Sequence, residues 1–209
     1  PDLQTPTTAM TVTLVNTTVS GNAAPSVGAM SVFGNISLEL DNSTVANNSA
    51  PGTGGINLTT GTVNAGPGNA AAPTLTLVSS ILANNGADLA TNTALMPAFT
   101  LDASNSLIEG ICSTCNISIS GTGNLIAVDP QLAALAFNGG PTRTHALLAS
   151  SPALDTGSNP LNLTTDQRGS GFARVVGAAA DMGAYESGTN TVTLTVTSAL
   201  LGVGLTIDG

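Results

Sequence analysis

The segment LDNSTVANNSAP (residues 40–51) has two close copies in this chain, LVNTTVSGNAAP at residues 14–25 and LVSSILANNGAD at 77–88. The aligned positions are Leu14, Leu40 and Leu77, and Asn22, Asn48 and Asn85. The copies are therefore offset by 26 and then by 37 residues. A weaker fourth copy, LDASNSLIEG at 101–110, begins with Leu101. Recurrence of this kind indicates structural units that stack on one another.

The repeats predict an all-β fold. A unit of 26 residues with short strands and turns has the size of one turn of a parallel β-helix. Each such unit buries its inward side chains only by stacking on the next. Val, Ile, Leu and Thr fill the strand-like runs, and Asn and Gly occupy the turns. We therefore expect a parallel β-helix (β-solenoid), with a β-sandwich as the competing fold. The segment GTVNAGPGNAAAP (61–73) is expected to leave the coil as a loop.

Charge is scarce in this chain. Charged residues make up 7% of it, against roughly 25% in ordinary soluble domains. Lys is absent, and the net charge of -9 disfavours nucleic acid and anionic membranes as partners. No apolar run reaches the ~18 residues of a membrane-spanning helix, so we expect no membrane insertion. Few charges also mean weak repulsion between copies, which favours self-association.

The two cysteines, Cys112 and Cys115, lie in the segment ICSTC. With one His and no second Cys pair, one chain cannot complete a structural zinc site. A local disulfide that closes a turn is the preferred interpretation, with free thiols as the alternative. A disulfide would place the protein outside the cytoplasm.

The C-terminal part carries the most specific sequence signal. Its segments are NLIAVDPQL (124–132), NGGPT (138–142), THALL (144–148), SPALDTG (151–157), TDQRG (165–169) and DMGAYE (181–186). In this order they resemble the choice-of-anchor Q domain at the C-terminal end of bacterial secreted β-helix proteins. The repeats at 14–88 are similar to the TISGN repeats that precede that domain.

The resemblance implies a right-handed, pectin-lyase-like β-helix on an exported surface protein, and it implies no catalytic residues. We expect β-helix rungs over residues 1–129, an irregular C-terminal cap region over 130–188 and a terminal strand over 189–209. No sorting signal follows Glu186, and the strand-like tail stands there instead.

Candidate catalytic residues are few. Hydrolysis of a glycosidic bond needs two carboxyl groups facing one sugar. Before the C-terminal region, only Glu39 and Asp41 have the i, i+2 spacing that puts two acids on one strand face. We interpret them as a solvated face. His145, the sole imidazole, has no Ser or Cys partner identifiable by spacing, so no catalytic residue is expected.

The acids of the C-terminal region are denser. We expect a structural ion-pair network there, with calcium binding and catalysis as alternatives. Its members would be Asp155, Asp166, Arg168 and Asp181. We expect no cofactor, with calcium as the alternative.

Seven Asn-x-Ser/Thr sequons occur in the chain, and we interpret them as turn residues and inward Asn ladders rather than as glycosylation sites. They begin at Asn16, Asn35, Asn42, Asn47, Asn57, Asn116 and Asn162.

The tail TNTVTLTVTSALLGVGLTIDG (189–209) has the alternation of a strand. It would cap an open end of its own helix, add to a neighbouring molecule or link the protein to an anchor, and the second of these contacts would generate a fibre. We expect an extracellular, non-enzymatic subunit of a surface fibre or layer that associates with itself. The alternatives are an adhesin or module that binds surface glycans, and a degenerate polysaccharide lyase or hydrolase.

Overall fold

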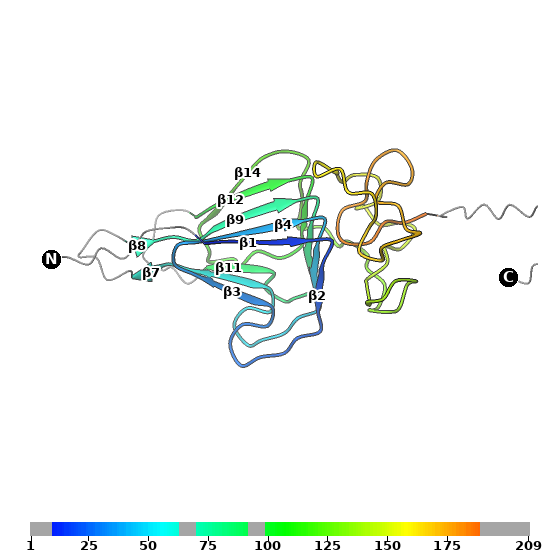
Figure 1. Cartoon of the computed structure of the whole chain (residues 1–209). Coiled ribbons are helices and arrows are strands. Elements are labelled where there is room, and N and C mark those ends of the chain that lie inside the picture. The colour runs from blue at the N-terminus through cyan, green and yellow to red at the C-terminus, as the bar shows by residue number, and fades with distance from the viewer. Residues whose placement is uncertain (1–9, 63–69, 92–98, 189–209) are drawn as a thin grey trace, which may run out of the picture.

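The computed structural model of the chain describes residues 10–62, 70–91 and 99–188 (Figure 1). Within these residues the secondary structure consists of strands alone. None of the described segments forms a helix with the length and apolarity to cross a membrane. The expected strand at 189–209 lies outside the described residues.

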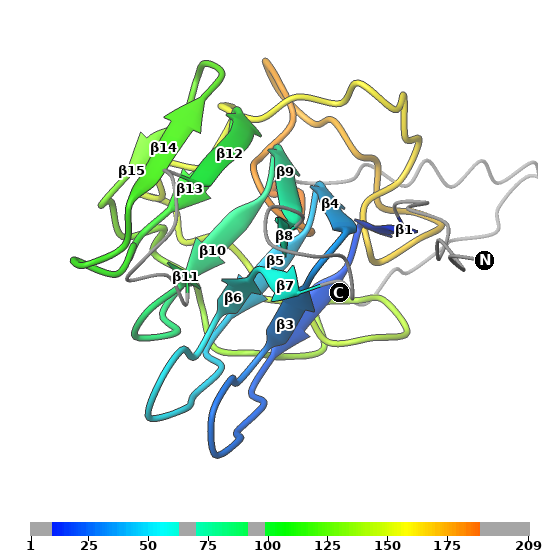
Figure 2. The same cartoon turned by 90° about the vertical axis from the view of Figure 1, so that its left-hand side faces the viewer.

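The strands form three parallel sheets that lie at angles to one another (Figures 1 and 2). The first sheet has the order β1 (Met10–Val15), β4 (Ile36–Asp41), β9 (Thr74–Val78), β12 (Phe99–Ser104) and β14 (Ile117–Ser120). The second has the order β2 (Thr18–Ser20), β5 (Thr44–Ala46), β10 (Ile81–Ala83), β13 (Leu107–Ile108) and β15 (Leu125–Ile126). The third contains β3 (Met30–Phe33), β6 (Ile56–Thr59) and β11 (Leu89–Thr91).

This arrangement is all-β and compatible with a β-helix. Each of the first three repeats contributes one strand to each sheet, whereas the fourth and the last contribute strands to the first two sheets only, and corresponding strands of successive repeats pair. The competing β-sandwich is built from antiparallel sheets, whereas these three sheets are parallel throughout. We call residues 10–35 the first repeat and residues 117–128 the last repeat.

The register follows the sequence alignment in the first three repeats and departs from it in the fourth. Leu14 pairs with Leu40, and Leu40 with Leu77. The next partner of Leu77 is Ala103, while Leu101 pairs with Leu75. The predicted start of the fourth copy at Leu101 is therefore wrong by two residues. A shift of two keeps every side chain on its face of the strand, so the alternation of apolar residues does not reveal it.

The segment 61–73 breaks the repeat length. It contains a short antiparallel pair, β7 (Gly61–Thr62) with β8 (Ala70–Ala71), which belongs to none of the three parallel sheets. Because this pair lies between β6 and β9, it accounts for the longer second offset and agrees with the expected loop.

The apolar core lies between the sheets, and its burial depends on position in the stack. Leu40, Leu77 and Leu101 are at most 1% exposed. In the end repeats, Val12 of β1 and Ile119 of β14 pack against the same core but are only partly buried. The two ends of the stack therefore leave apolar side chains partly uncovered.

An asparagine ladder crosses the first three repeats. The backbone N–H and Nδ2 of Asn22 donate to Oδ1 of Asn48 at 3.1 and 2.9 Å. The same two groups of Asn48 donate to Oδ1 of Asn85 at 2.8 and 2.9 Å. Asn85 donates in turn to Oδ1 of Asp88 at 2.9 and 2.8 Å, so a carboxylate ends the ladder. Asn22, Asn48 and Asn85 are the aligned asparagines of the sequence repeats.

A second ladder lies at the turn between the first and second sheets. The N–H of Thr17 donates to Oγ of Ser43, that of Ser43 to Ser80, and that of Ser80 to Ser106, at 3.1–3.2 Å. The N–H of Ser106 then donates to Oδ1 of Asn124 at 3.0 Å. The hydrogen bonds of both ladders run in the same direction: the N–H of an earlier repeat donates to the side-chain oxygen of a later one.

The residue before each member of this second ladder has a left-handed backbone. Asn16, Asn42, Ser79 and Asn105 have φ of 46°, 44°, 50° and 48°. Asn tolerates this conformation better than most residues, which explains two of the sequons. Their side chains point to the C-terminal region: Asn16 donates to Thr165 O at 2.8 Å, and Asn42 to Ser158 O at 3.0 Å.

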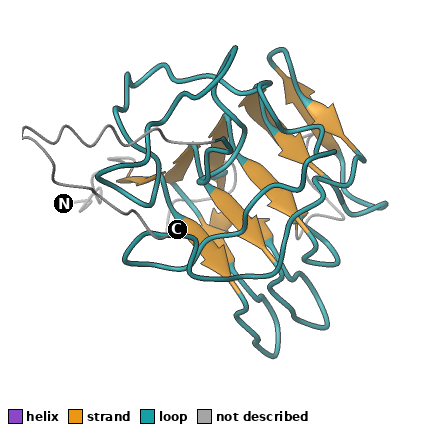
Figure 3. Ribbon diagram, turned by 90° about the vertical axis from the view of Figure 1, so that its right-hand side faces the viewer, coloured by secondary structure: helices purple, strands orange, loops and turns teal. Residues whose placement is uncertain are grey.

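The C-terminal region, residues 130–188, is irregular and covers the outer face of the second sheet (Figure 3). Ala153 and Met182 form a second apolar cluster with the outward side chains of Ile81, Ala83 and Leu107. A Cβ on Gly183 (φ 92°) would lie 2.7 Å from Thr44 Oγ1, so glycine allows the close approach to the sheet. The expected irregular C-terminal region thus lies across the flank of the stack.

Candidate functional site

A groove of about 580 Å³ separates the first repeat from the C-terminal region. Six of its nine lining residues carry hydroxyl or amide side chains, and Arg143 is its charged residue. The lining residues are Asn16, Thr17, Thr18, Ser20, Leu135, Pro141, Thr142, Arg143 and Gln167.

Gln167 fixes the two walls of this groove to each other. Its Oε1 accepts a hydrogen bond from Thr18 Oγ1 of β2 at 2.5 Å. Its Nε2 donates to Thr142 Oγ1 at 2.9 Å and to Arg143 O at 3.3 Å. The segment 142–143 is therefore held beside the first repeat, at one end of the stack.

His145 lies near this groove, buried, with only 2% of its surface exposed. Its Nδ1 is 2.7 Å from Ala133 O, and because a carbonyl only accepts, Nδ1 carries the proton. Nε2 then accepts from Ser20 Oγ at 2.8 Å and from Asn47 Nδ2 at 3.4 Å. The sequence did not identify this serine, because 125 residues separate it from His145.

A Ser–His hydrogen bond is also the geometry of a nucleophile and its base. Here the imidazole is oriented by a neutral carbonyl and shared with the amide of Asn47, which belongs to the second repeat. The three contacts hold the C-terminal region to the first two repeats. We assign His145 a structural role.

Asp166 and Arg168 form a buried ion pair. The carboxylate Oδ2 of Asp166 accepts from Nε and Nη2 of Arg168 at 2.9 and 2.6 Å. The guanidinium carbon lies 4.1 Å from the ring centre of Phe172 and 3.9 Å from that of Tyr185. A Cβ on Gly139 (φ 109°) would lie 2.3 Å from Phe172, so the NGGPT segment needs glycine to pack here.

A second buried ion pair joins Arg174 to Glu186 at 2.8 Å, with both side chains fully buried. Arg174 also donates to the carbonyls of Gly183 and Asp181, at 2.9 and 3.1 Å. Burial raises the pKa of the Glu186 carboxyl, and hydrogen bonds from backbone N–H groups and Arg174 oppose that rise. The predicted network did not include this pair.

Asp155 and Asp181 accept backbone hydrogen bonds instead of pairing with arginine. Asp155 Oδ1 accepts from the N–H of Ala178 at 3.0 Å. Asp181 accepts from the N–H of Asp155 and of Ser187, at 2.8 and 2.6 Å. The four-residue network predicted from the sequence is therefore corrected: Asp166 and Arg168 form an ion pair, while these two carboxylates fix loops.

Glu39 and Asp41 lie on the outer face of the first sheet, as Leu38 and Leu40 point inward. Burial raises the pKa of Asp41, and the charge of Glu39 raises it further. Asp41 pairs in register with Val15 and Val78, so apolar side chains flank it and explain its burial, and the interpretation as a solvated face is wrong for this residue. No third acid of this face is close enough for a metal site in the described part of the chain.

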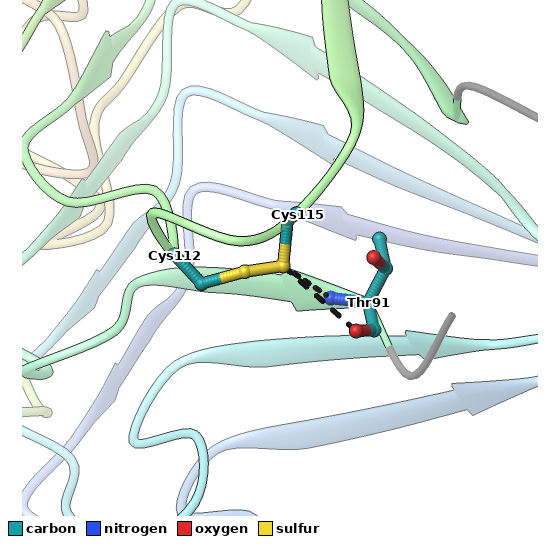
Figure 4. The surroundings of a disulfide bond; sticks show 3 residues. All are labelled: Thr91, Cys112 and Cys115. Atoms are coloured by element: carbon teal, nitrogen blue, oxygen red, sulfur yellow. Dashed lines mark hydrogen bonds between the residues drawn. A yellow bond between two sulfur atoms is a disulfide. The ribbon is translucent and has the colours of Figure 1, made fainter. Parts of the chain in front are cut away.

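Cys112 and Cys115 are joined by a disulfide that closes a turn after β13 (Figure 4). Sγ of Cys115 accepts a hydrogen bond from the N–H of Thr91 at 3.2 Å. The disulfide therefore ties this turn to β11 in the third sheet.

The two ends of the stack are a further candidate site. The first repeat and the last repeat contain no Asp, Glu, Lys or Arg. Within the described residues, β1, β2, β14 and β15 each pair with a strand on one side only. The second ladder presents Thr17 at one end and the N–H of Asn124 at the other, with no partner for this N–H among the described residues.

Comparison with protein-family models, with curated proteins and with solved structures gives no match to this chain.

Proposed function

We propose that the chain is a secreted, right-handed parallel β-helix that joins copies of itself end to end as a structural subunit of a surface fibre or layer. The observation that carries the proposal is the character of the two end repeats. Both lack charged side chains, and both leave apolar core residues partly exposed. Natural sheets use charges, proline or bulges to keep their edge strands from pairing with other chains, and the two end repeats have no charged side chains.

The polarity of the second ladder supports a head-to-tail contact. A last repeat stacked on the first repeat of another copy would bring the N–H of Asn124 toward the hydroxyl of Thr17. That contact would continue the pattern by which Ser43, Ser80 and Ser106 bind their neighbours. A contact between two different surfaces does not close on itself and generates a fibre.

Two features support an extracellular site. The disulfide fits an oxidising compartment. The C-terminal segments resemble the choice-of-anchor Q domain of secreted proteins.

Single-end blocking tests the proposal. Val12→Lys places a charge on the inward face of the first repeat, and Ile119→Lys does the same in the last repeat. In sedimentation velocity and electron microscopy we expect the wild type to form end-to-end assemblies of several copies and each variant alone to remain monomeric. A mixture of the two variants should stop at dimers, because each retains one open end.

Thr100→Lys, on the outer face of β12, adds the same charge outside the two end repeats and should leave the end-to-end assemblies intact. Thermal unfolding of each variant controls for loss of the fold. A wild type that stays monomeric at all concentrations would show that the proposal is wrong. Deletion of residues 189–209 then tests the role of the tail. If the assemblies disappear on deletion, the tail connects copies; if they become longer, the tail caps the stack.

A further inference from the structure

A hairpin of the C-terminal region, residues 131–148, runs along the stack from its last repeat to its first. Its base is fixed by the bridge between Leu132 and Leu147, and both side chains pack against the second apolar cluster, as Leu125 of the last repeat also does. Its upper part is fixed by the bridge between Ala136 and Thr144.

The tip of this hairpin lies beside the first repeat. It carries Phe137, which is 67% exposed, and Arg143, whose guanidinium carbon is 4.8 Å from the centre of that ring. Arg168 and Arg174 are buried in ion pairs. Arg143 is therefore the arginine that offers its charge to solvent, and it does so at the first-repeat end.

The residues that lead from the last repeat into the hairpin, and the base of the hairpin itself, have the complementary character. Asp129 is exposed three residues after β15, and its Oδ1 accepts from the N–H of Gln131 at 2.7 Å. Leu148 is 48% exposed beside it, with its N–H donating to Gln131 O at 3.0 Å. An acid and an apolar side chain at one end thus match a cation and a ring at the other.

We propose that Arg143 of one copy pairs with Asp129 of the next, and that Phe137 packs on Leu148 of that neighbour, within the end-to-end contact. This inference rests on the proposed head-to-tail stacking. Translation of one copy along the stack brings the hairpin tip of one molecule to the hairpin base of the other. Complementary charges at a contact fix orientation and suppress wrong pairings. They matter more here because each copy has a net charge of -9.

The test is a charge swap in the full chain, read as the critical concentration for assembly. Arg143→Glu and Asp129→Arg should each raise it by about tenfold, because each puts two like charges in contact. The double variant R143E/D129R restores an opposite pair in every contact and should return to within about twofold of the wild type. Added salt should narrow the difference between each single variant and the wild type, since the pair lies at the rim of the contact and is screened there.

Asp102→Arg is the matched control, because Asp102 is an exposed acid of β12, outside both end repeats, and the net change in charge is the same. D102R alone should not raise the critical concentration as D129R does. The combination R143E/D102R should not restore assembly as R143E/D129R does. Thermal unfolding of every variant separates loss of contact from loss of fold.

The outcomes of the two experiments are distinguishable. Wild-type chains that respond equally to D102R and D129R, or a double variant that fails to recover, would overturn this pairing and leave end-to-end stacking in place. A monomeric wild type would overturn the stacking itself and this pairing with it.

Discussion

Buried polar groups differ in kind between the stacked repeats and the C-terminal region. In the repeats most of them are neutral amides and hydroxyls, such as Asn48, Asn85 and Ser80, at most 4% exposed. In the C-terminal region they include Arg174 and Glu186, at most 1% exposed. The backbone explains the difference. A regular stack brings each donor to an equivalent acceptor one repeat away, whereas an irregular chain has no such neighbour.

Arginine compensates for the missing regularity, because its guanidinium has five donors in a fixed fork. Arg174 alone connects Glu186 and the carbonyls of Gly183 and Asp181. A few charged side chains therefore pair the buried polar groups that a ladder would pair in the repeats. Each of them contributes more to the stability of its surroundings than any one ladder residue does.

The largest effect should come from breaking the Arg174–Glu186 pair. Arg174→Met keeps a long apolar side chain but leaves the Glu186 carboxylate buried without its cation. We expect a loss of about 3–5 kcal/mol in the free energy of unfolding, measured in urea. Glu186→Gln in the same background removes the orphaned charge and should recover part of the loss. A cost below about 1 kcal/mol for R174M would show that the C-terminal region does not depend on the pair.

A smaller effect is expected from the asparagine ladder, and it should depend on the repeat. Asn48→Ala removes the acceptor of Asn22 and the donor to the carbonyls of Val19 and Ala46, at 3.0 and 3.1 Å. We expect a loss of about 2–3 kcal/mol from these buried unpaired groups.

Asn22→Ala is the matched variant at the open end, where water replaces the lost partner. It should cost less than about 1 kcal/mol in urea unfolding of the monomer. Equal costs for the two alanine variants would mean that position in the stack does not set the contribution of a ladder residue.

The smallest effect should be the contribution of Asp41 to the pH dependence of folding stability. Its pKa is raised in the folded state, so the folded protein holds this proton more tightly than the unfolded chain does. Stability should therefore fall as pH rises from the unfolded value of 3.8 through the raised folded value, and the deficit should persist at pH 7.

Asp41→Asn removes this ionisation. We expect the variant to be more stable than the wild type at pH 7, with the difference shrinking as pH falls toward 3.8. Urea midpoints of both proteins across this range give the comparison, because the raised pKa values of Asp88 and Glu186 contribute equally to both. A difference that grows on acidification would contradict the assigned direction.

Much of the stack could be predicted from the sequence. The aligned leucines and asparagines lie in register, because each repeat binds its neighbour at the same positions. The start of the fourth repeat could not be predicted, since a two-residue slip preserves the inward face. The placement of the C-terminal region was missed as well. The outward apolar residues Ile81 and Leu107 were the signal, because a solvated outer face would not carry them.

The candidate site was less predictable than the stack. The groove, the Ser20–His145 contact and the Arg174–Glu186 pair each join residues whose spacing in the sequence follows no period. His145 reaches Ser20 across 125 residues, and Arg174 donates both to Glu186 and to the carbonyl of Gly183.

The sequence by itself determined the repeat unit, its parallel stacking, the low charge and the identity of the ladder residues. These features follow from local periodicity, which repeats wherever the chain repeats. Only the tertiary structure decided where the C-terminal region lies, which acids pair with which arginines, and that Arg143 and Asp129 stand at opposite ends. Those outcomes depend on how an irregular chain satisfies buried polar groups against a distant surface, and no sequence period specifies that.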